Sequence, residues 1–170
     1  MNRPFSPQDL ITAAVVLAAA LLVPQLFHSI QNAGSIFLPM HIPVLVGGFF
    51  LSPPAALVVG ILAPLLSGAV TGMPAYPFAW LMAVELGTYG LVTSLLSRRP
   101  EMNALAGAMV AGRLVRFLLS MGFYPLVVGV PFSATLVAGA LLFQSLPGMA
   151  LQLLIIPPLV RRIRSARKTL

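Results

Sequence analysis

Long apolar runs, separated by short polar or proline-rich segments, make up most of the chain. Such runs are typical of helices that cross a membrane, because about 20 helical residues span roughly 30 Å of hydrocarbon. Proline and glycine mark the boundaries, as in Ser52-Pro53-Pro54 and Thr71-Gly72-Met73-Pro74, where a helix cannot easily continue. The pattern predicts six helices, at about 10–27, 38–51, 54–70, 77–96, 104–124 and 134–160.

The second run is the shortest, with only 14 residues between 38 and 51. That is less than a full membrane crossing requires. A re-entrant hairpin formed by this run and the run at 54–70 would leave four spans instead of six. Both arrangements put the two termini on the same side of the membrane. The pattern alone therefore does not decide between six spans and four.

Lysine and arginine outside the apolar runs indicate the orientation. They occur only in the N-terminal segment, in the 97–103 connection and in a basic tail at 161–170, whereas the connections 28–37, 71–76 and 125–133 have none. Because cytoplasmic loops carry the excess of basic residues, we predict that both termini are cytoplasmic. The basic residues concerned are Arg3, Arg98, Arg99, Arg161, Arg162, Arg164, Arg167 and Lys168.

Composition supports an all-α, polytopic membrane protein, a six-transmembrane-helix bundle forming a single membrane domain over residues 1–170. Hydrophobic residues make up 59% of the chain and charged residues 8%, against about 25% charged in a soluble domain, and mean hydropathy is +1.00. A soluble enzyme is therefore excluded. The net charge of +7 reflects topology, since the basic residues flank apolar runs, so we expect a lipid bilayer and no nucleic acid as partner. There is no cysteine to form a thiolate nucleophile or a disulfide.

Three strongly charged residues lie inside predicted spans, namely Glu85, Arg113 and Arg116. A charge in the membrane interior costs about 2.5 to 3.5 kcal/mol on insertion scales, so these side chains should face the bundle interior and pair. Arg113 and Arg116 share a helix face, and we expect Glu85 to neutralise Arg113 and leave Arg116 available. The group forms either a site for an anionic or acceptor-rich substrate or a structural ion pair.

His41 and Tyr89 are further candidates for binding. His41 lies between two prolines in the string LPMHIPV, where its ring could bond a ligand or an irregular backbone. Tyr89 follows Glu85 by four residues and so shares its helix face. No aspartate or glutamate lies within a helical turn of either histidine, so we expect no metal site and no cofactor.

Ala14 and Ala18 place two small residues one turn apart on the first helix. Small residues at this spacing let two helices approach closely. The alanine face serves either packing within the bundle or docking of a partner membrane subunit.

Three strings together resemble a known family: LPMHIPVLVGGFFLSPPAALVVGILAPLLSGAVTGMPAYPFAWLMAVELGTYGLVTSLL, MVAGRLVRF and LPGMALQLLIIPPLV. They resemble the substrate-binding S component of energy-coupling factor (ECF) vitamin transporters, from about Leu38 to Val160. The resemblance implies a six-helix bundle in a prokaryotic plasma membrane that binds a vitamin or related micronutrient at the exoplasmic side. It also implies association with a membrane T subunit and two ATPase subunits that power import.

Carried over residue by residue, the resemblance implies that Ala14 and Ala18 contact the T subunit. The nickel and cobalt members of the family have histidine directly after the initiator methionine, whereas this chain has Asn2, which argues against that metal branch. The residues that the resemblance implies for the substrate pocket are Met40, His41, Met73, Tyr76, Glu85, Tyr89, Arg113 and Arg116.

Two other functions remain as alternatives. A stand-alone facilitator or channel for small solutes would need a polar stripe repeated through several helices, and that stripe is weak here. The other alternative is a membrane-embedded enzyme or a small assembly factor. An enzyme would need at least two convergent acid, base or nucleophilic residues, and Glu85 has no such companion. We therefore expect a binding subunit that is not an enzyme, with ATP hydrolysis in its partners.

Overall fold

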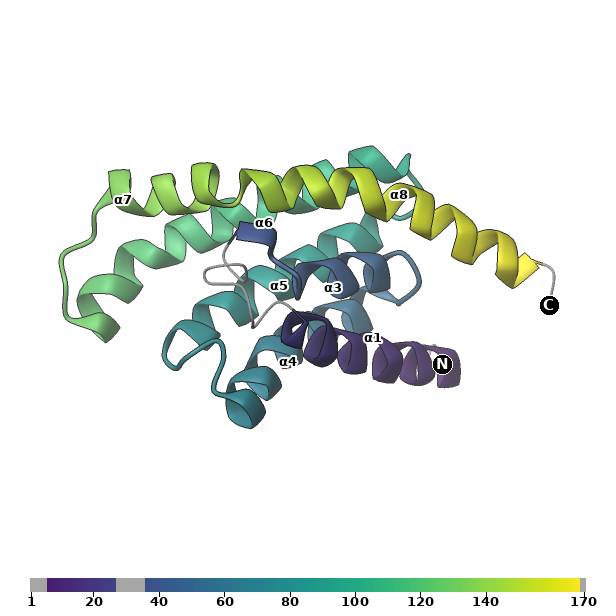
Figure 1. Ribbon diagram of the computed structural model, residues 1–170, viewed down its shortest axis with the longest axis horizontal. Coiled ribbons are helices and arrows are strands. Elements are labelled where there is room, and N and C mark those ends of the chain that lie inside the picture. The colour runs from purple at the N-terminus through teal and green to yellow at the C-terminus, as the bar shows by residue number, and fades with distance from the viewer. Residues whose placement is uncertain (1–5, 27–35, 169–170) are drawn as a thin grey trace.

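The protein is a bundle of helices. The computed structural model describes residues 6–26 and 36–168 and contains no strand in these ranges (Figure 1). Five helices are long and apolar enough to cross a membrane, which confirms the predicted all-helical, polytopic bundle. They are α1 (Pro7–Gln25), α4 (Pro53–Thr71), α5 (Phe78–Leu95), α6 (Glu101–Phe123), which continues into the π-helical turn η1 (Tyr124–Val128), and α8 (Leu146–Lys168).

Both ends of the described chain lie at the same end of the bundle, where the N and C labels stand in Figure 1. Contacts at this end join elements that are far apart in sequence. The Ser52 backbone N–H, just before α4, donates to the Asp9 carboxylate in α1 at 2.9 Å. The Arg164 guanidinium in α8 donates to the Ser97 carbonyl oxygen after α5 at 2.9 Å. The start of α1 thus lies beside the chain that enters α4, and the end of α8 lies beside the chain that leaves α5.

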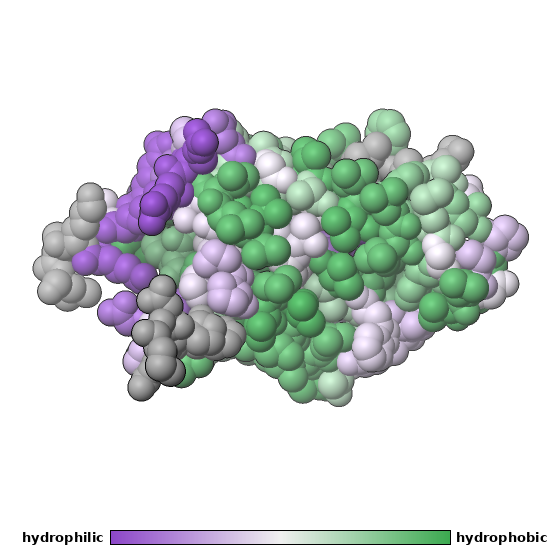
Figure 2. Space-filling view, turned by 180° about the vertical axis from the view of Figure 1, so that it is seen from behind, coloured by the Kyte–Doolittle hydropathy of each residue, from purple (hydrophilic) through white to green (hydrophobic). Residues whose placement is uncertain are grey.

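Polar and apolar surfaces are separated along the bundle. Figure 2 shows hydrophilic residues gathered at the end that holds the chain termini and hydrophobic residues over the middle of that face. We call this end the basic end, because the last two turns of α8 and the α5–α6 connection bring their arginines there. Its orientation toward the cytoplasm stays a prediction from the distribution of lysine and arginine.

The helix expected over 38–51 is shorter in the structure, where it is α3 (His41–Gly48). Eight helical residues rise only about 12 Å, so α3 cannot cross the membrane alone. It lies instead inside the bundle, where it packs against α1, α4, α5 and α8. The neighbouring α4 is long enough for a full crossing. The number of membrane spans, six or four with a re-entrant hairpin, stays a prediction.

Side chains of α3 take part in two of the three apolar clusters of the bundle. Leu45 packs with residues of α5, α6 and α8, and Val44 packs with residues of α1, α4 and α5. Glycines allow this crowding, since a Cβ at Gly47 would overlap the Val16 side chain and a Cβ at Gly48 would overlap Thr93. The apolar side chains in the run at 38–51 thus pack against other helices of the protein.

The last helical region differs from the single helix expected over 134–160 and from the separate tail expected over 161–170. It is divided into α7 (Ala134–Ala138), the π-helical segment η2 (Gly139–Gln144) and α8. Pro147 does not kink a helix but lies in the first turn of α8, where proline is tolerated. The end of α8 stays helical through Lys168 because its arginines find partners, with Arg164 Nη1 3.1 Å from Glu101 Oε1 and the Arg167 guanidinium stacked over the Phe50 ring.

Asp9 fixes the start of α1 to the rest of the bundle. Its carboxylate accepts from the Ser6 backbone in a capping box and from the backbone and hydroxyl of Ser52. We expect Asp9→Ala to lower the free energy of unfolding by about 1–2 kcal/mol, because the cap and the link between helices are lost together. Denaturant unfolding of the purified protein measures this loss. Replacement of the exposed neighbour Gln8 with alanine is the control, and an equal effect of both changes would contradict the role of Asp9.

Candidate functional site

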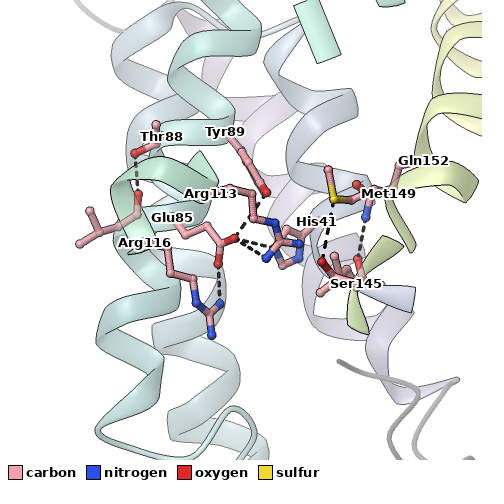
Figure 3. A network of polar contacts seen from close by, with 11 residues as sticks. His41, Glu85, Thr88, Tyr89, Arg113, Arg116, Ser145, Met149 and Gln152 are labelled. Carbon is pink, nitrogen blue, oxygen red and sulfur yellow. Dashed lines mark hydrogen bonds and ion pairs between the residues drawn. The ribbon is translucent and has the colours of Figure 1, made fainter. Parts of the chain in front are cut away.

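A buried polar cluster joins α5 and α6 in the bundle interior (Figure 3). The Glu85 side chain is fully buried, and each of its oxygens meets one arginine. Arg113 Nη1 lies 3.0 Å from Oε1, and Arg116 Nη1 donates to Oε2 at 2.5 Å. The two arginines can reach one carboxylate because they lie three residues apart on the same face of α6. The expectation that Glu85 neutralises Arg113 alone is therefore wrong.

His41 and Tyr89 complete this cluster. The Tyr89 hydroxyl donates to Glu85 Oε1 at 3.4 Å, and the His41 and Tyr89 rings meet edge to face with centroids 5.2 Å apart. His41 Nε2 lies 3.9 Å from Glu85 Oε1, beyond hydrogen-bond distance. Gly112 makes room for the Tyr89 ring against α6, since a Cβ there would overlap it. Three helices thus bring together five of the residues expected to bind substrate, namely His41, Glu85, Tyr89, Arg113 and Arg116.

Several buried polar atoms of the cluster have no hydrogen-bond partner within the described part of the chain. They are Nδ1 and Nε2 of His41 and Nε and Nη2 of Arg113. Both side chains are more than nine-tenths buried. A buried polar group without a partner costs about 1–3 kcal/mol, and more when it is charged. The cluster is therefore built to make more hydrogen bonds than its own side chains supply.

A model of the family described as ECF transporter, substrate-specific component, matches residues 8–160. The chain belongs to this family. The match covers the long helices except Pro7 of α1 and the end of α8, and it includes every residue of the polar cluster. No curated protein and no solved structure matches the chain.

Membership assigns the polar cluster to a transport protein of the cell membrane. Substrate-specific components are substrate-binding transporter subunits and are not enzymes. The family also implies a small-molecule substrate and a membrane complex with other ECF subunits. The five apolar helices agree with a multi-pass protein of the cell membrane.

Three of the residues expected to line the pocket of this substrate-specific component lie outside the polar cluster. Met40 packs in an apolar cluster with Ala20, Val44, Ala63 and Leu86. Met73 and Tyr76 lie in the α4–α5 connection, 57% and 48% exposed, and the Tyr76 hydroxyl donates to the Leu65 carbonyl oxygen at 2.9 Å. A role of these three side chains in binding stays a prediction.

Gln152 of α8 hydrogen-bonds to the backbone just before α3. Its side-chain nitrogen donates to the Leu38 carbonyl oxygen at 3.4 Å, and Gln152 is 1% exposed. Leu38 has a φ of 51°, a left-handed conformation that is uncommon for leucine, so the chain turns sharply just before His41. The sequence alone does not indicate this contact, because a glutamine in a span can hydrogen-bond to any neighbouring helix. In the substrate-specific component it holds the turn that places His41.

Ala14 and Ala18 lie on the outside of the bundle. Both are exposed, and so are Ile11 and Leu22 on the same face of α1. Next to this face, residues of α1 and α4 line an open apolar groove that includes Ala14 and Val58. Of the two roles considered for the alanine face, the structure leaves Ala14 and Ala18 free for contact with lipid or another membrane protein.

No group of three or more histidine, cysteine, aspartate or glutamate side chains that could hold a metal ion occurs among the described residues. His41 and Glu85 form a pair, and the cations beside them are arginines. The chemistry that this site offers is hydrogen bonding and charge pairing.

Proposed function

We propose that this ECF substrate-specific component captures a vitamin or related micronutrient at the exoplasmic side of the membrane and passes it inward. Transport would take place in complex with a membrane T subunit and two ATPase subunits, which hydrolyse ATP. In this proposal His41, Glu85, Tyr89, Arg113 and Arg116 contact the substrate. Met40, Met73 and Tyr76 line its path or close over it.

The observation that carries the proposal is the polar cluster with its unsatisfied donors, in a chain that belongs to a family of binding subunits. Glu85 follows the start of α5 by about two turns, and Arg116 precedes the end of α6 by about two turns. Both positions are nearer to the end of the bundle opposite the basic end. If the basic end faces the cytoplasm, the cluster is within reach of a solute arriving from outside.

The exposed face of α1 supports a separate surface for the T subunit. Ala14 and Ala18 offer little side-chain bulk, so a partner helix could approach the α1 backbone closely. The docking surface and the polar cluster lie on different elements, α1 on the one hand and α3, α5 and α6 on the other. Binding and docking can therefore be separated by mutation.

We expect His41→Ala and Ala14→Trp to have opposite effects. Protein purified in detergent after growth in rich medium should release a small molecule at about one per chain, which mass spectrometry would detect. Ala14→Trp should keep this molecule but lose the T and ATPase subunits in co-purification, because the large ring blocks helix approach. His41→Ala should lose the molecule, because it removes a side chain of the cluster.

Val110→Trp is a matched control, since it adds the same bulk to a lipid-facing position of α6 that is 68% exposed. It should keep both the small molecule and the partner subunits. Release of no compound by any folded form would contradict the proposed function and favour a facilitator with weak binding. Loss of partners in Val110→Trp as well would contradict a specific role for the alanine face.

A further inference from the structure

One edge of the buried Arg113 guanidinium lacks hydrogen-bond partners among the described residues. Its Nη1 is engaged by Glu85, whereas Nε and Nη2 have no partner in the described structure. The Nε–H and Nη2–H bonds of an arginine point in the same direction and form one of the planar forks that bind a carboxylate through two parallel hydrogen bonds. The pairing with Glu85 thus uses the other side of the group and keeps this fork available.

The charge of the cluster is not balanced. Glu85 contributes one negative charge and Arg113 and Arg116 one positive charge each, so the sum is +1 with His41 neutral. No other charged side chain in the ranges 6–26 and 36–168 pairs with these three. An excess charge in the membrane interior is costly, and a single added negative charge would remove it. A dianion such as a phosphate monoester would instead leave an excess of the opposite sign.

The unsatisfied atoms are mostly donors. Arg113 offers one N–H on Nε and two on Nη2, and a neutral His41 offers one N–H and one acceptor nitrogen. A bound group that satisfies them needs at least two acceptor atoms next to each other. A carboxylate has two coplanar oxygens and no hydrogen, whereas a primary amide brings one oxygen and a second donor.

We propose that the substrate carries a single carboxylate that binds to the Nε and Nη2 edge of Arg113, with His41 beside it and Glu85 holding the guanidinium in place. This inference rests on the proposed function and specifies its substrate class. The remainder of the substrate molecule is left open, since the cluster recognises the acid group.

The test uses full-length protein in lipid nanodiscs, freed of small molecules by extended washing. An extract of rich growth medium is passed over an anion-exchange resin at pH 7, which separates retained acids from unretained neutral and cationic compounds. Thermal unfolding is then followed with each fraction. We expect only the acid fraction to raise the melting temperature. Methyl esterification of that fraction should abolish the effect, and phosphatase treatment should leave it unchanged.

Arg113→Lys tests the geometry of the fork. Lysine keeps the positive charge near Glu85 but lacks the planar edge, so about tenfold or more of the acid fraction should be needed for half-maximal stabilisation. Arg161→Lys at the basic end, where the arginine side chain is 70% exposed, is the matched control and should behave as the unmodified protein. An unchanged response of Arg113→Lys would overturn the role of the fork. If this variant does not fold, the esterification experiment on the unmodified protein decides.

The other outcomes separate the two proposals. Stabilisation by the unretained fraction would leave the binding function standing and overturn the carboxylate. Loss of the effect on phosphatase treatment would also overturn it, in favour of a phosphate. If neither fraction stabilises the protein, the proposed binding function fails and the carboxylate fails with it.

Discussion

We expect Glu85→Gln to lower the free energy of unfolding by about 3–5 kcal/mol, since removal of one partner from a buried ion pair leaves uncompensated charge. Here one substitution would leave two arginines without their carboxylate, with Arg113 almost completely buried. Denaturant unfolding in detergent micelles or nanodiscs, followed by circular dichroism, measures the loss. Glu85 would then be a structural residue as well as a member of the proposed binding site.

Glu101→Gln is the matched control for this prediction. Glu101 also meets two arginines, Arg161 and Arg164, but these are 70% and 37% exposed at the basic end. Exposed ion pairs contribute about 0–1 kcal/mol, so the control should have a small effect. Equal losses for the two variants would contradict a special role for the buried cluster. Adding Arg116→Met to Glu85→Gln should restore part of the stability, because one of the unpaired charges is then gone.

We expect Gly60→Leu to be the most damaging change outside the polar cluster, with a loss of about 3 kcal/mol or more from overpacking. Gly60 lies where α4 crosses α5, and a Cβ there would overlap the backbone carbonyl of Leu86. A side chain can change its rotamer to relieve an overlap, whereas the backbone of a helix cannot. The two helices would have to separate along the most extensive contact in the bundle. The melting temperature of the purified variant measures the effect.

Gly107→Leu is the control for Gly60→Leu, because it makes the same change in another helix. A Cβ at Gly107 would meet only the end of the Leu96 side chain, which can rotate away. Leucine is also a better helix former than glycine, so this variant should be neutral or slightly more stable. Similar losses for both variants would indicate that the backbone contact between α4 and α5 is not the cause.

The long helices other than α8 could be predicted from hydropathy to within a few residues at most of their ends. Expected and observed bounds agree closely for 54–70, observed as Pro53–Thr71, and for 77–96, observed as Phe78–Leu95. The reason is physical, because lipid cannot satisfy backbone hydrogen bonds and a long apolar segment must be helical. The place of α3 could not be predicted in this way, since an apolar segment surrounded by protein has the same composition as one surrounded by lipid.

The extension of α8 was missed for a different reason. A run of arginines at the end of a chain has the composition of a solvated tail. Its helical state depends on Glu101, more than 50 residues earlier, and on the Phe49 and Phe50 rings at the end of α3. No local pattern contains that information. The capping box at Ser6 and Asp9 lies outside the helix expected from residue 10, although a serine three residues before an acidic residue at the start of an apolar run is a recognisable local signal.

The sequence indicated which charged residues would come together in the polar cluster, but it did not indicate the geometry of their contacts. Glu85, Arg113 and Arg116 stood out because isolated charges in spans must pair. Which arginine atoms the carboxylate engages depends on the rotation of α5 against α6, and this rotation decides that one edge of Arg113 stays open. Met73 and Tyr76 were expected to line the substrate pocket because of the family resemblance. The sequence contained no information on their distance from the polar cluster.

The shortness of α3 has a consequence for biosynthesis. A helix of eight residues that ends in two glycines is too short to remain in a bilayer by its own hydrophobicity. It is held by α1, α4, α5 and α8, and three of these are translated after it. We therefore expect this segment to take its place only after the later helices have been inserted, in a step of tertiary folding. Since α3 carries His41, the polar cluster is completed only when that late step has taken place.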